Sequence, residues 1–388
     1  MNAAPLNVLI IGTGMYVCGR GTDGYGTILP AVLQARRRGA VGEIHVAGRT
    51  AENFVEFGRR ARELARTLGV DGHYVAYPKH GVGENSYQAA LAALPDPGAV
   101  LICTPDAQHT RMAIDTARAG RPFLVVKPLT PTYDEALQVL AATEKAGVHG
   151  VVEFHKRWDW ANLQLYQRLR QGEIGQPLYF KVEYSQRKSI PTQVFRNWVD
   201  QTNIFQYLAV HYVDLIHFMT GATPLRASAV GQKVVLPTHG IDNYDAIQAT
   251  VEWSAGFTSV FLVNWVDPES SPAMSQQKIE VVGSLGRIDS DQVNRGTEVW
   301  TSKGITQVNP QFCQLYQPPG EPQPSYRGYG IDSVDSFLED ARRLGAGETT
   351  VADLAGRRPT IRSALASSSV IEAVNKSLAA RGAWKDCR

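Results

Sequence analysis

The sequence is poor in cysteine and lacks long hydrophobic runs. Its four cysteines, at positions 18, 103, 313 and 387 of 388 residues, never have the Cys-x-x-Cys spacing of a zinc site. This pattern predicts neither a disulfide framework nor a metal site, and it is typical of a reducing compartment, so we expect a cytoplasmic protein. The apolar run at residues 6–11 is too short for a signal-peptide core or a membrane span. We therefore expect a soluble chain without a membrane partner.

An excess of charge of one sign is also missing. Lys+Arg 39 against Asp+Glu 37 gives a net charge of +2, and no long block of like charges stands out. This balance argues against a nucleic-acid partner and favours a small-molecule ligand. Hydrophobic residues make up 44% and charged residues 20%, as in ordinary globular proteins. At roughly 150 residues per domain, the length predicts two to three domains.

Short apolar runs alternate with helical patterns over residues 1–155. The runs have the length and composition of strands buried on both faces of a sheet, and they lie at 7–11, 44–47, 100–103, 123–126 and 148–154. Helical patterns lie at 28–38, 51–68, 87–94, 108–119 and 133–146, with Thr50 as an expected N-cap. Repeated β-α-β units predict an N-terminal Rossmann domain, an α/β doubly wound parallel sheet over residues 1–155.

The pattern changes in residues 156–388. After a helix at 161–171, strands with period-two alternation are expected at 178–184, 227–233, 246–253, 258–265, 278–282 and 298–301. Residues 309–329, rich in Pro, Gly, Gln and Tyr, are expected to be a loop before helices at 333–343 and 362–379. The second domain is thus predicted as α+β, with a large, mainly antiparallel open sheet.

Glycines follow the first expected strand directly. Gly12-Thr13-Gly14-Met15 stands where a tight turn lets a pyrophosphate approach the backbone before a helix. The third glycine of G-x-G-x-x-G is missing, because Val17 occupies its position, and further glycines up to Gly26 precede the helix. We interpret this segment as a dinucleotide-binding loop lengthened by roughly ten residues. The alternative is a glycine-rich turn without a ligand.

The end of the second expected strand indicates which dinucleotide binds. An acidic residue there would bind the ribose 2′-hydroxyl and repel a 2′-phosphate, but the chain reads Gly48-Arg49-Thr50. A guanidinium and a hydroxyl suit a phosphate dianion. The sequence therefore favours NADP(H) over NAD(H). The alternative for Arg49 is a solvated surface charge.

Four segments resemble motifs of the glucose-fructose oxidoreductase, inositol dehydrogenase and MocA (Gfo/Idh/MocA) family. They are Thr104-Pro105 with His109, then Val126-Lys127-Pro128, residues 154–159, and residues 283–286. The second departs from the E-K-P motif, because Val126 replaces the glutamate. The resemblance implies a two-domain oxidoreductase in which Thr104, Pro105, His109 and Pro128 lie along the cofactor and Lys127 lies beside the nicotinamide.

The resemblance extends to a helix of the second domain. The family pattern D-x-x-x-H-x-x-D is matched by His211 and Asp214, whereas Tyr207 replaces the first aspartate. Residues 207 and 211 are four apart, so on an α-helix they would share a face. The resemblance implies that Tyr207 and His211 face the substrate. The alternatives are an aromatic core residue for Tyr207 and a satisfied core histidine for His211.

Hydride transfer between a carbinol carbon and a nicotinamide requires a group that exchanges a proton with the substrate oxygen. Lys127 is the first candidate, because a lysine at a buried strand end is costly unless it is paired, and burial lowers its pKa. The alternative is that Lys127 pairs with a carboxylate or a cofactor phosphate. We expect His211 to assist it and Tyr207 to position the substrate. Asp214 would orient the imidazole, or alternatively cap local backbone groups. His155, Arg157 and Trp198 are further candidates for substrate binding.

We therefore predict an NADP(H)-dependent oxidoreductase acting on a sugar, a sugar acid such as the uronate galacturonate, or a cyclitol. Aromatic faces stack on sugar C–H surfaces, and basic side chains of the second domain would bind a carboxylate. Two alternatives stay open, namely a non-catalytic dinucleotide-sensing regulator of the same fold and an NAD-retaining glycosidase. By resemblance, the second domain would bind substrate and pair through its open sheet as a homodimer or homotetramer.

Overall fold

The computed structural model describes residues 4–83 and 85–388, which form two compact units. The first unit comprises the chain up to Leu129, Ala136–Trp158 and Gln311–Ser363. The second comprises Thr130–Glu135, Asp159–Pro310 and Ala364–Arg388. The expected boundary at residue 155 lies close to one of the crossings, but residues 311–363 return to the first unit. The assignment of separate functions to two domains stays a prediction.

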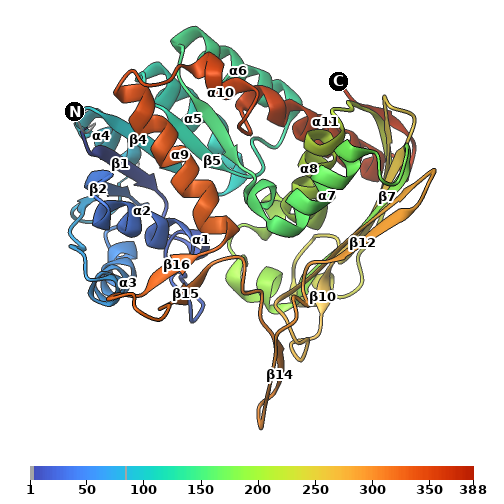
Figure 1. The fold of residues 1–388 in the computed structure, drawn as a ribbon, viewed down its shortest axis with the longest axis horizontal. Helices are drawn as coiled ribbons and strands as arrows, with labels where there is room; N and C mark the ends of the chain where they lie inside the picture. Colours follow the sequence, from blue (N-terminus) through green and yellow to red (C-terminus); the bar gives the residue numbers. More distant parts are fainter. Residues whose placement is uncertain (1–3, 84) are drawn as a thin grey trace. The chain divides into compact units, whose positions relative to one another are not determined.

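The first unit contains a six-stranded parallel sheet (Figure 1). Its order is β3-β2-β1-β4-β5-β6, formed by β1 (Leu6–Ile11), β2 (Val41–Ala47), β3 (Val75–Tyr77), β4 (Gly98–Ile102), β5 (Phe123–Val126) and β6 (Gly150–Glu153). The predicted Rossmann sheet is confirmed, although the three-residue β3 was not expected. The order reverses between β1 and β4, and ligands of such sheets bind at the carboxyl ends of the strands near this reversal.

Helices cover both faces of this sheet. They are α1 (Met15–Cys18), α2 (Ile28–Arg37), α3 (Asn53–Leu68), α4 (Ser86–Ala93), α5 (His109–Arg118), α6 (Tyr133–Ala146), α9 (Tyr329–Gly345) and α10 (Val351–Ala355). Val8 and Ile10 of β1 join a buried cluster with α2, α3 and α9. Thr50 is not the N-cap of α3, because its backbone bridges to Val82 in an extended conformation and Glu52 takes the cap position.

Helix α9 follows the segment expected to be a loop. Within residues 309–329 the strands β15 (Gln314–Tyr316) and β16 (Ser325–Arg327) form a small antiparallel hairpin. The helix then buries Val334 and Phe337 in the core of the first unit. A late segment of the chain therefore completes the dinucleotide-type fold.

The second unit contains a seven-stranded mixed sheet, ordered β12-β11-β7-β10-β9-β8-β17. Its strands are β7 (Pro177–Arg187), β8 (Pro224–Gln232), β9 (Ala246–Trp253), β10 (Thr258–Asp267), β11 (Ser275–Gly283), β12 (Arg287–Asp291) and β17 (Lys385–Asp386). The predicted, mainly antiparallel sheet is confirmed, with one parallel pair between β7 and β10. A separate hairpin joins β13 (Glu298–Thr301) to β14 (Gly304–Gln307).

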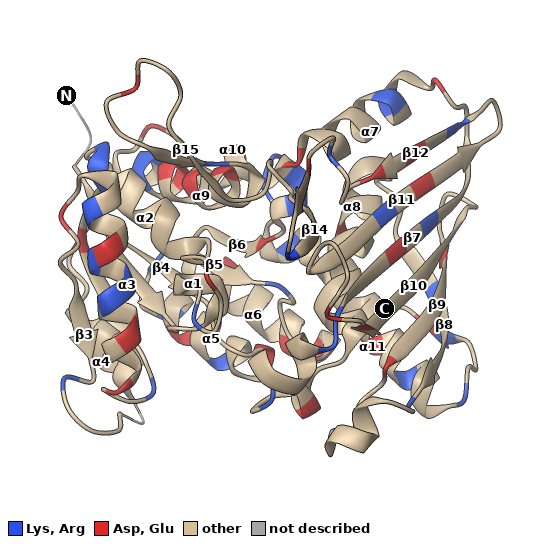
Figure 2. Cartoon of the chain, turned by 90° about the horizontal axis from the view of Figure 1, so that it is seen from below, with Lys and Arg blue, Asp and Glu red and all other residues tan. Residues whose placement is uncertain are grey.

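The two faces of the mixed sheet differ in polarity. Phe180 and Val182 of β7 are buried on the face that packs against α7 (Trp160–Gln171), α8 (Val210–Thr220) and α11 (Ile361–Ala379). On the opposite face Lys181 and Glu183 form an ion pair of 2.5 Å, and Figure 2 shows charged residues of both signs along the strands. Leu178 is 53% exposed, so the alternation predicted from residue 178 begins only at Phe180. Oligomer formation through this face stays a prediction.

Residues 4–83 and 85–388 contain neither a helix suited to span a membrane nor a cluster of metal-binding side chains. None of the helices in this part of the chain is both long and apolar enough to cross a membrane. In the same residues, no three His, Cys, Asp or Glu side chains gather as they would around a metal ion.

Candidate active site

The turn after β1 is tight and leaves open space beside its backbone. Gly12 has a φ of 119°, and a Cβ atom there would lie 2.2 Å from the carbonyl oxygen of Cys103, so glycine is needed. A Cβ atom on Gly14 would meet nothing within 4 Å, so the space beside this residue is open. The predicted cofactor residues Gly12, Thr13, Gly14 and Met15 thus surround a turn that a pyrophosphate can approach closely.

The lengthened loop after this turn packs against α3. Arg60, 8% exposed, donates hydrogen bonds to the carbonyls of Thr22, at 2.7 Å, and Gly24. Glu56 accepts a 3.0 Å bond from the same guanidinium. The loop is therefore held down by one buried arginine of its own unit.

The carboxyl end of β2 carries cations and no carboxylate. Gly48 donates its N–H to the carbonyl of Tyr77, and Arg49 lies exposed beyond it. The segment after β3 pairs with this end, since Gly83 N–H donates to the Arg49 carbonyl at 3.1 Å. That segment exposes Lys79 and His80, which the sequence interpretation missed. Their only signal was a pair of basic residues after a very short strand.

His109 links the ends of β4 and β5. It is fully buried, with Nε2 2.8 Å from the carbonyl oxygen of Thr104 and Nδ1 2.8 Å from that of Pro128. Burial lowers the pKa of His109 below its ordinary value. Both ring nitrogens therefore contact backbone oxygens, which fixes the loops of Thr104-Pro105 and Lys127-Pro128 relative to each other. The expected contact of His109 with a cofactor stays a prediction.

Lys127 follows β5 directly and is partly exposed. Packing around its amine lowers the pKa of Lys127 to about 7, chiefly by burial. Glu153 and Asp106 oppose this effect, whereas the positive charge of Lys156 adds to it. The structure thus brings two amines and two carboxylates to the carboxyl ends of β4, β5 and β6. An amine of this pKa exchanges protons readily near neutral pH.

His155 lies in a cage of rings beside this cluster. It is 7% exposed, and its ring centroid lies 5.6 Å from that of Tyr329 and 5.3 Å from that of Phe312. Its Nδ1 atom is 2.9 Å from Oε2 of Glu153 and 3.3 Å from the hydroxyl of Tyr16. His155 therefore contacts a buried carboxylate, and its expected contact with substrate stays a prediction, as does that of the partly buried Arg157.

Glu153 was missed as a functional residue. It is 2% exposed at the end of β6, within the apolar run that predicted this strand. A carboxylate in such a run is a signal, because burying a charge is costly unless it is paired. Its charge raises the pKa of Lys127, which is distant in the chain, so the sequence alone does not reveal this interaction.

In the second unit the structure brings Tyr207 and Trp198 together. Tyr207 packs on Phe195, Trp198 and Trp265 with centroid distances of 4.8, 6.1 and 5.8 Å. The expected continuous helix is interrupted, because Phe205–Ala209 forms a π-helical turn before α8 begins at Val210. The four-residue spacing of Tyr207 and His211 therefore does not place them on one α-helical face. His211 and Asp214 are both buried on α8.

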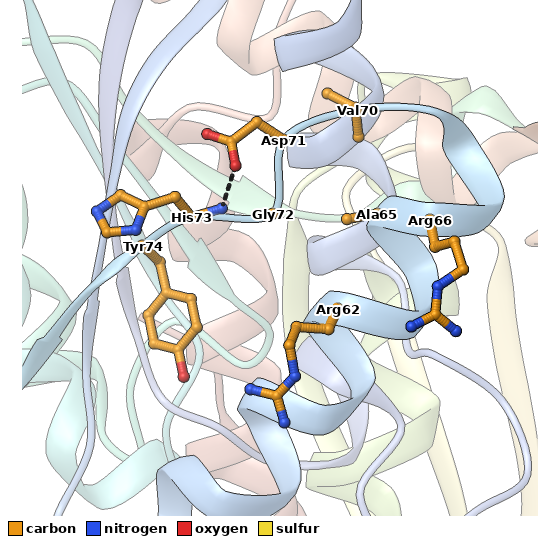
Figure 3. Close-up of a pocket in the computed structure, with 8 residues that line it drawn as sticks. All are labelled: Arg62, Ala65, Arg66, Val70, Asp71, Gly72, His73 and Tyr74. Carbon is orange, nitrogen blue, oxygen red and sulfur yellow. Dashed lines mark hydrogen bonds between the residues drawn. The ribbon is translucent and has the colours of Figure 1, made fainter.

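A cavity of about 510 Å³ lies elsewhere in the first unit (Figure 3). It is lined by residues at the end of α3 and the turn after it, namely Arg62, Ala65, Arg66, Val70, Asp71, Gly72, His73 and Tyr74. The Asp71 carboxylate accepts a 3.0 Å hydrogen bond from the backbone N–H of His73, so one of its oxygens is already bonded within the turn. None of the predicted site residues lines this cavity.

The strand order of the first unit is that of a dinucleotide-binding sheet, and two family models match the chain. Residues 6–154 match the oxidoreductase family with an NAD-binding Rossmann fold, and residues 162–289 match the GFO/IDH/MocA C-terminal domain. The chain belongs to the Gfo/Idh/MocA oxidoreductase family.

Individual relatives include two inositol dehydrogenases. The chain is 28% identical over 234 residues to scyllo-inositol 2-dehydrogenase (NAD(+)) of Bacillus subtilis, covering 59% of this chain and 62% of that protein. The match thus spans about three fifths of the relative's length. Myo-inositol 2-dehydrogenase of Thermotoga maritima is 25% identical over 248 residues, covering 63% of this chain and 68% of that protein.

A solved structure supports the same fold over nearly the whole chain. The crystal structure of myo-inositol 2-dehydrogenase from Lactobacillus plantarum superposes with a TM-score of 0.70 at 18% identity, covering 99% of this chain and 100% of that chain.

Proposed function

We propose that the protein is an NADP(H)-dependent oxidoreductase that interconverts a carbinol and a carbonyl carbon of a sugar, a sugar acid or a cyclitol. The observation that carries the proposal is Lys127, an amine with a pKa of about 7 at the carboxyl end of β5 in a dinucleotide-type sheet. Inositol is the substrate named for two relatives, and it is a cyclitol.

Lys127 exchanges the proton of the reaction. In oxidation, its neutral amine accepts the proton of the substrate hydroxyl, and in reduction its ammonium form returns a proton to the carbonyl oxygen. When bound, the nicotinamide cofactor accepts or supplies the hydride at the carbon. From the second unit, we assign His211 to assist this proton exchange, Asp214 to orient His211, and Tyr207 and Trp198 to bind the sugar. Arg157 and His155 complete the proposed substrate contacts.

The cofactor contacts follow from the ends of the strands. Gly12, Thr13, Gly14 and Met15 hold the pyrophosphate by close approach of the backbone. Thr104, Pro105, His109 and Pro128 border the nicotinamide half. A side chain at Gly12 would collide with the backbone of Cys103, so the tight turn requires glycine. A tight glycine turn after the first strand is what supports dinucleotide binding at this place.

The preference for NADP(H) is the finer part of the proposal. The end of β2 is where an NAD-binding sheet carries a carboxylate for the ribose, and this chain has Arg49 and Thr50 there instead. Lys79 and His80 lie on the segment that pairs with these residues. Cations at this place attract the 2′-phosphate of NADP(H). The matched Bacillus relative is named for NAD(+), so the preference depends on this chain's own residues.

The direct test is a substrate panel. Purified protein is assayed with NADP(H) and NAD(H) against inositols, aldoses and uronates such as galacturonate, and cofactor binding is measured in parallel. We expect turnover with at least one member and tighter binding of NADPH than NADH. Binding without turnover would favour a dinucleotide sensor, and cleavage of glycosides without net oxidation would favour a glycosidase.

A further inference from the structure

Glu153 has a buried carboxylate whose two oxygens lie in different surroundings. Its carboxylate is buried at the end of β6, where an unpaired charge is costly. One oxygen, Oε2, accepts the 2.9 Å hydrogen bond from His155. The other, Oε1, is buried and has no hydrogen-bond partner among residues 4–83 and 85–388. A carboxylate held on one side and available on the other is suited to act on a neighbouring charged group.

His155 fixes the orientation of this carboxylate. Its ring lies among Tyr16, Phe312 and Tyr329 at centroid distances of 6.2, 5.3 and 5.6 Å. Because Glu153 accepts the bond, the Nδ1 atom of His155 is assigned as the protonated nitrogen. The aromatic cage prevents the imidazole from turning away, so Glu153 keeps its position at the sheet edge.

The register of the sheet places Glu153 beside Val126, the residue that precedes Lys127. Val126 of β5 pairs with Glu153 of β6, and paired residues of neighbouring strands share a face at about 4.8 Å. Val126 stands where the E-K-P resemblance leads us to expect a carboxylate. In this chain the carboxylate therefore lies one strand across, still adjacent to the residue that precedes Lys127.

Several ionisable groups lie near Lys127 and Glu153. Lys127 interacts with the carboxylates of Glu153 and Asp106 and with the amine of Lys156. Tyr16 and Cys103 also lie close to Glu153, which raises the pKa of both side chains, after the larger effect of burial. Both of these groups are therefore neutral near pH 7, so neither adds a charge beside the amine of Lys127.

We propose that Glu153 is a positioning residue for Lys127: its carboxylate, fixed by His155, holds the amine at the end of β5 and stabilises the ammonium form during proton exchange. This inference rests on the proposed function for its catalytic meaning. The interaction between Glu153 and Lys127 is testable without turnover.

The experiment measures the titration of Lys127 directly. The folded protein is labelled with limiting acetic anhydride across pH, and the acetylation of the peptide containing Lys127 is followed by mass spectrometry. In the wild type we expect a midpoint at about 7. Glu153→Gln removes an interaction that raises this pKa, so its midpoint should fall by about one pH unit.

Two further variants separate positioning from simple structural support. Asp340→Asn removes another buried carboxylate of the same unit, one paired with Arg358, and should destabilise the fold while leaving the Lys127 midpoint unchanged. The double variant Val126→Glu/Glu153→Val moves the carboxylate to the paired strand and should return the midpoint toward the wild-type value. Where Glu153→Gln fails to fold, Glu153→Asp provides the test: its shorter side chain moves the carboxylate away from the amine and should lower the Lys127 midpoint, and an unchanged midpoint would overturn the role of Glu153.

The outcomes distinguish the two proposals. An unchanged Lys127 midpoint in Glu153→Gln, or equal shifts in Glu153→Gln and Asp340→Asn, would overturn the role of Glu153. With an active substrate, kcat of Glu153→Gln should fall about tenfold and its pH profile should move with the labelling midpoint. Absence of turnover in the wild type, with the labelling shift intact, would overturn the proposed function but not the contact.

Discussion

The carboxyl ends of β2 and β5 lie at the same edge of one sheet, yet they use charge differently. At β2, Arg49, Lys79 and His80 are exposed, and water screens their charges. At β5, the charges around Lys127 are packed together, and burial lowers the pKa of this lysine to about 7. Exposed basic side chains attract a charged ligand, whereas the closely packed amine of Lys127 becomes able to exchange protons near neutral pH.

Removing the amine of Lys127 should have the largest effect on activity. Lys127→Ala should lower kcat by about 10²-fold or more, because the substrate oxygen loses its proton-exchange partner, while cofactor affinity changes little. Lys145→Ala, which removes an exposed lysine of α6, is the matched control and should leave steady-state kinetics unchanged. Equal kcat values in the two variants would remove Lys127 from the mechanism.

The pH dependence should separate the two directions of the reaction. Oxidation needs the neutral amine, so its rate should rise about tenfold per pH unit below a midpoint near 7 and level off above it. Reduction needs the ammonium form and should decline above the same midpoint. Rate profiles from pH 5 to 9 test this prediction. A common profile for both directions, or a midpoint near 10, would contradict the lowered pKa.

The cationic end of β2 should affect specificity rather than rate. Arg49→Ala should weaken NADPH binding about tenfold, or about 1.4 kcal/mol, with NADH binding unchanged. Gly48→Asp should favour NADH further, because a carboxylate binds the ribose hydroxyl and repels a 2′-phosphate. A side chain at this position meets Phe54 at 3.2 Å, so a small shift of that ring is expected.

Fluorescence titration with each cofactor measures these affinities. Arg62→Ala, an exposed arginine at the cavity of Figure 3, is the control and should change neither affinity. Equal NADPH and NADH affinities in the wild type would contradict the role of Arg49.

The contrast also explains what the sequence predicts well. The strands of the parallel sheet are apolar runs, so composition alone reveals most of them. Lys127 follows such a run directly, and Arg49 follows another after Gly48. Predicting a role for Glu153 requires the strand register, because Glu153 and Val126 are adjacent only through the pairing of β5 with β6. Helix α9 returns to the first unit after a hairpin, and no local pattern encodes that return.

The π-helical turn at Phe205–Ala209 shows the same limit in the second unit. The resemblance predicts a helix there, but a residue spacing does not distinguish a π-turn from an α-turn. The relation of Tyr207 to His211 depends on this difference. The aromatic packing of Tyr207 against Phe195 and Trp265 involves residues that are distant in sequence, so tertiary contacts accompany the local departure.

Adjacent arginines on α3 offer the smallest and most local test of buried against exposed charge. Arg60→Ala should lower the free energy of unfolding by about 2 kcal/mol, because the carbonyls of Thr22 and Gly24 lose a charged donor that is itself buried. Arg59 is exposed and pairs with Glu63 four residues on, so Arg59→Ala should leave the urea midpoint unchanged. Urea unfolding of both variants checks this difference. Equal destabilisation would mean that Arg60 does not hold the lengthened loop, since helix propensity changes identically in the two substitutions.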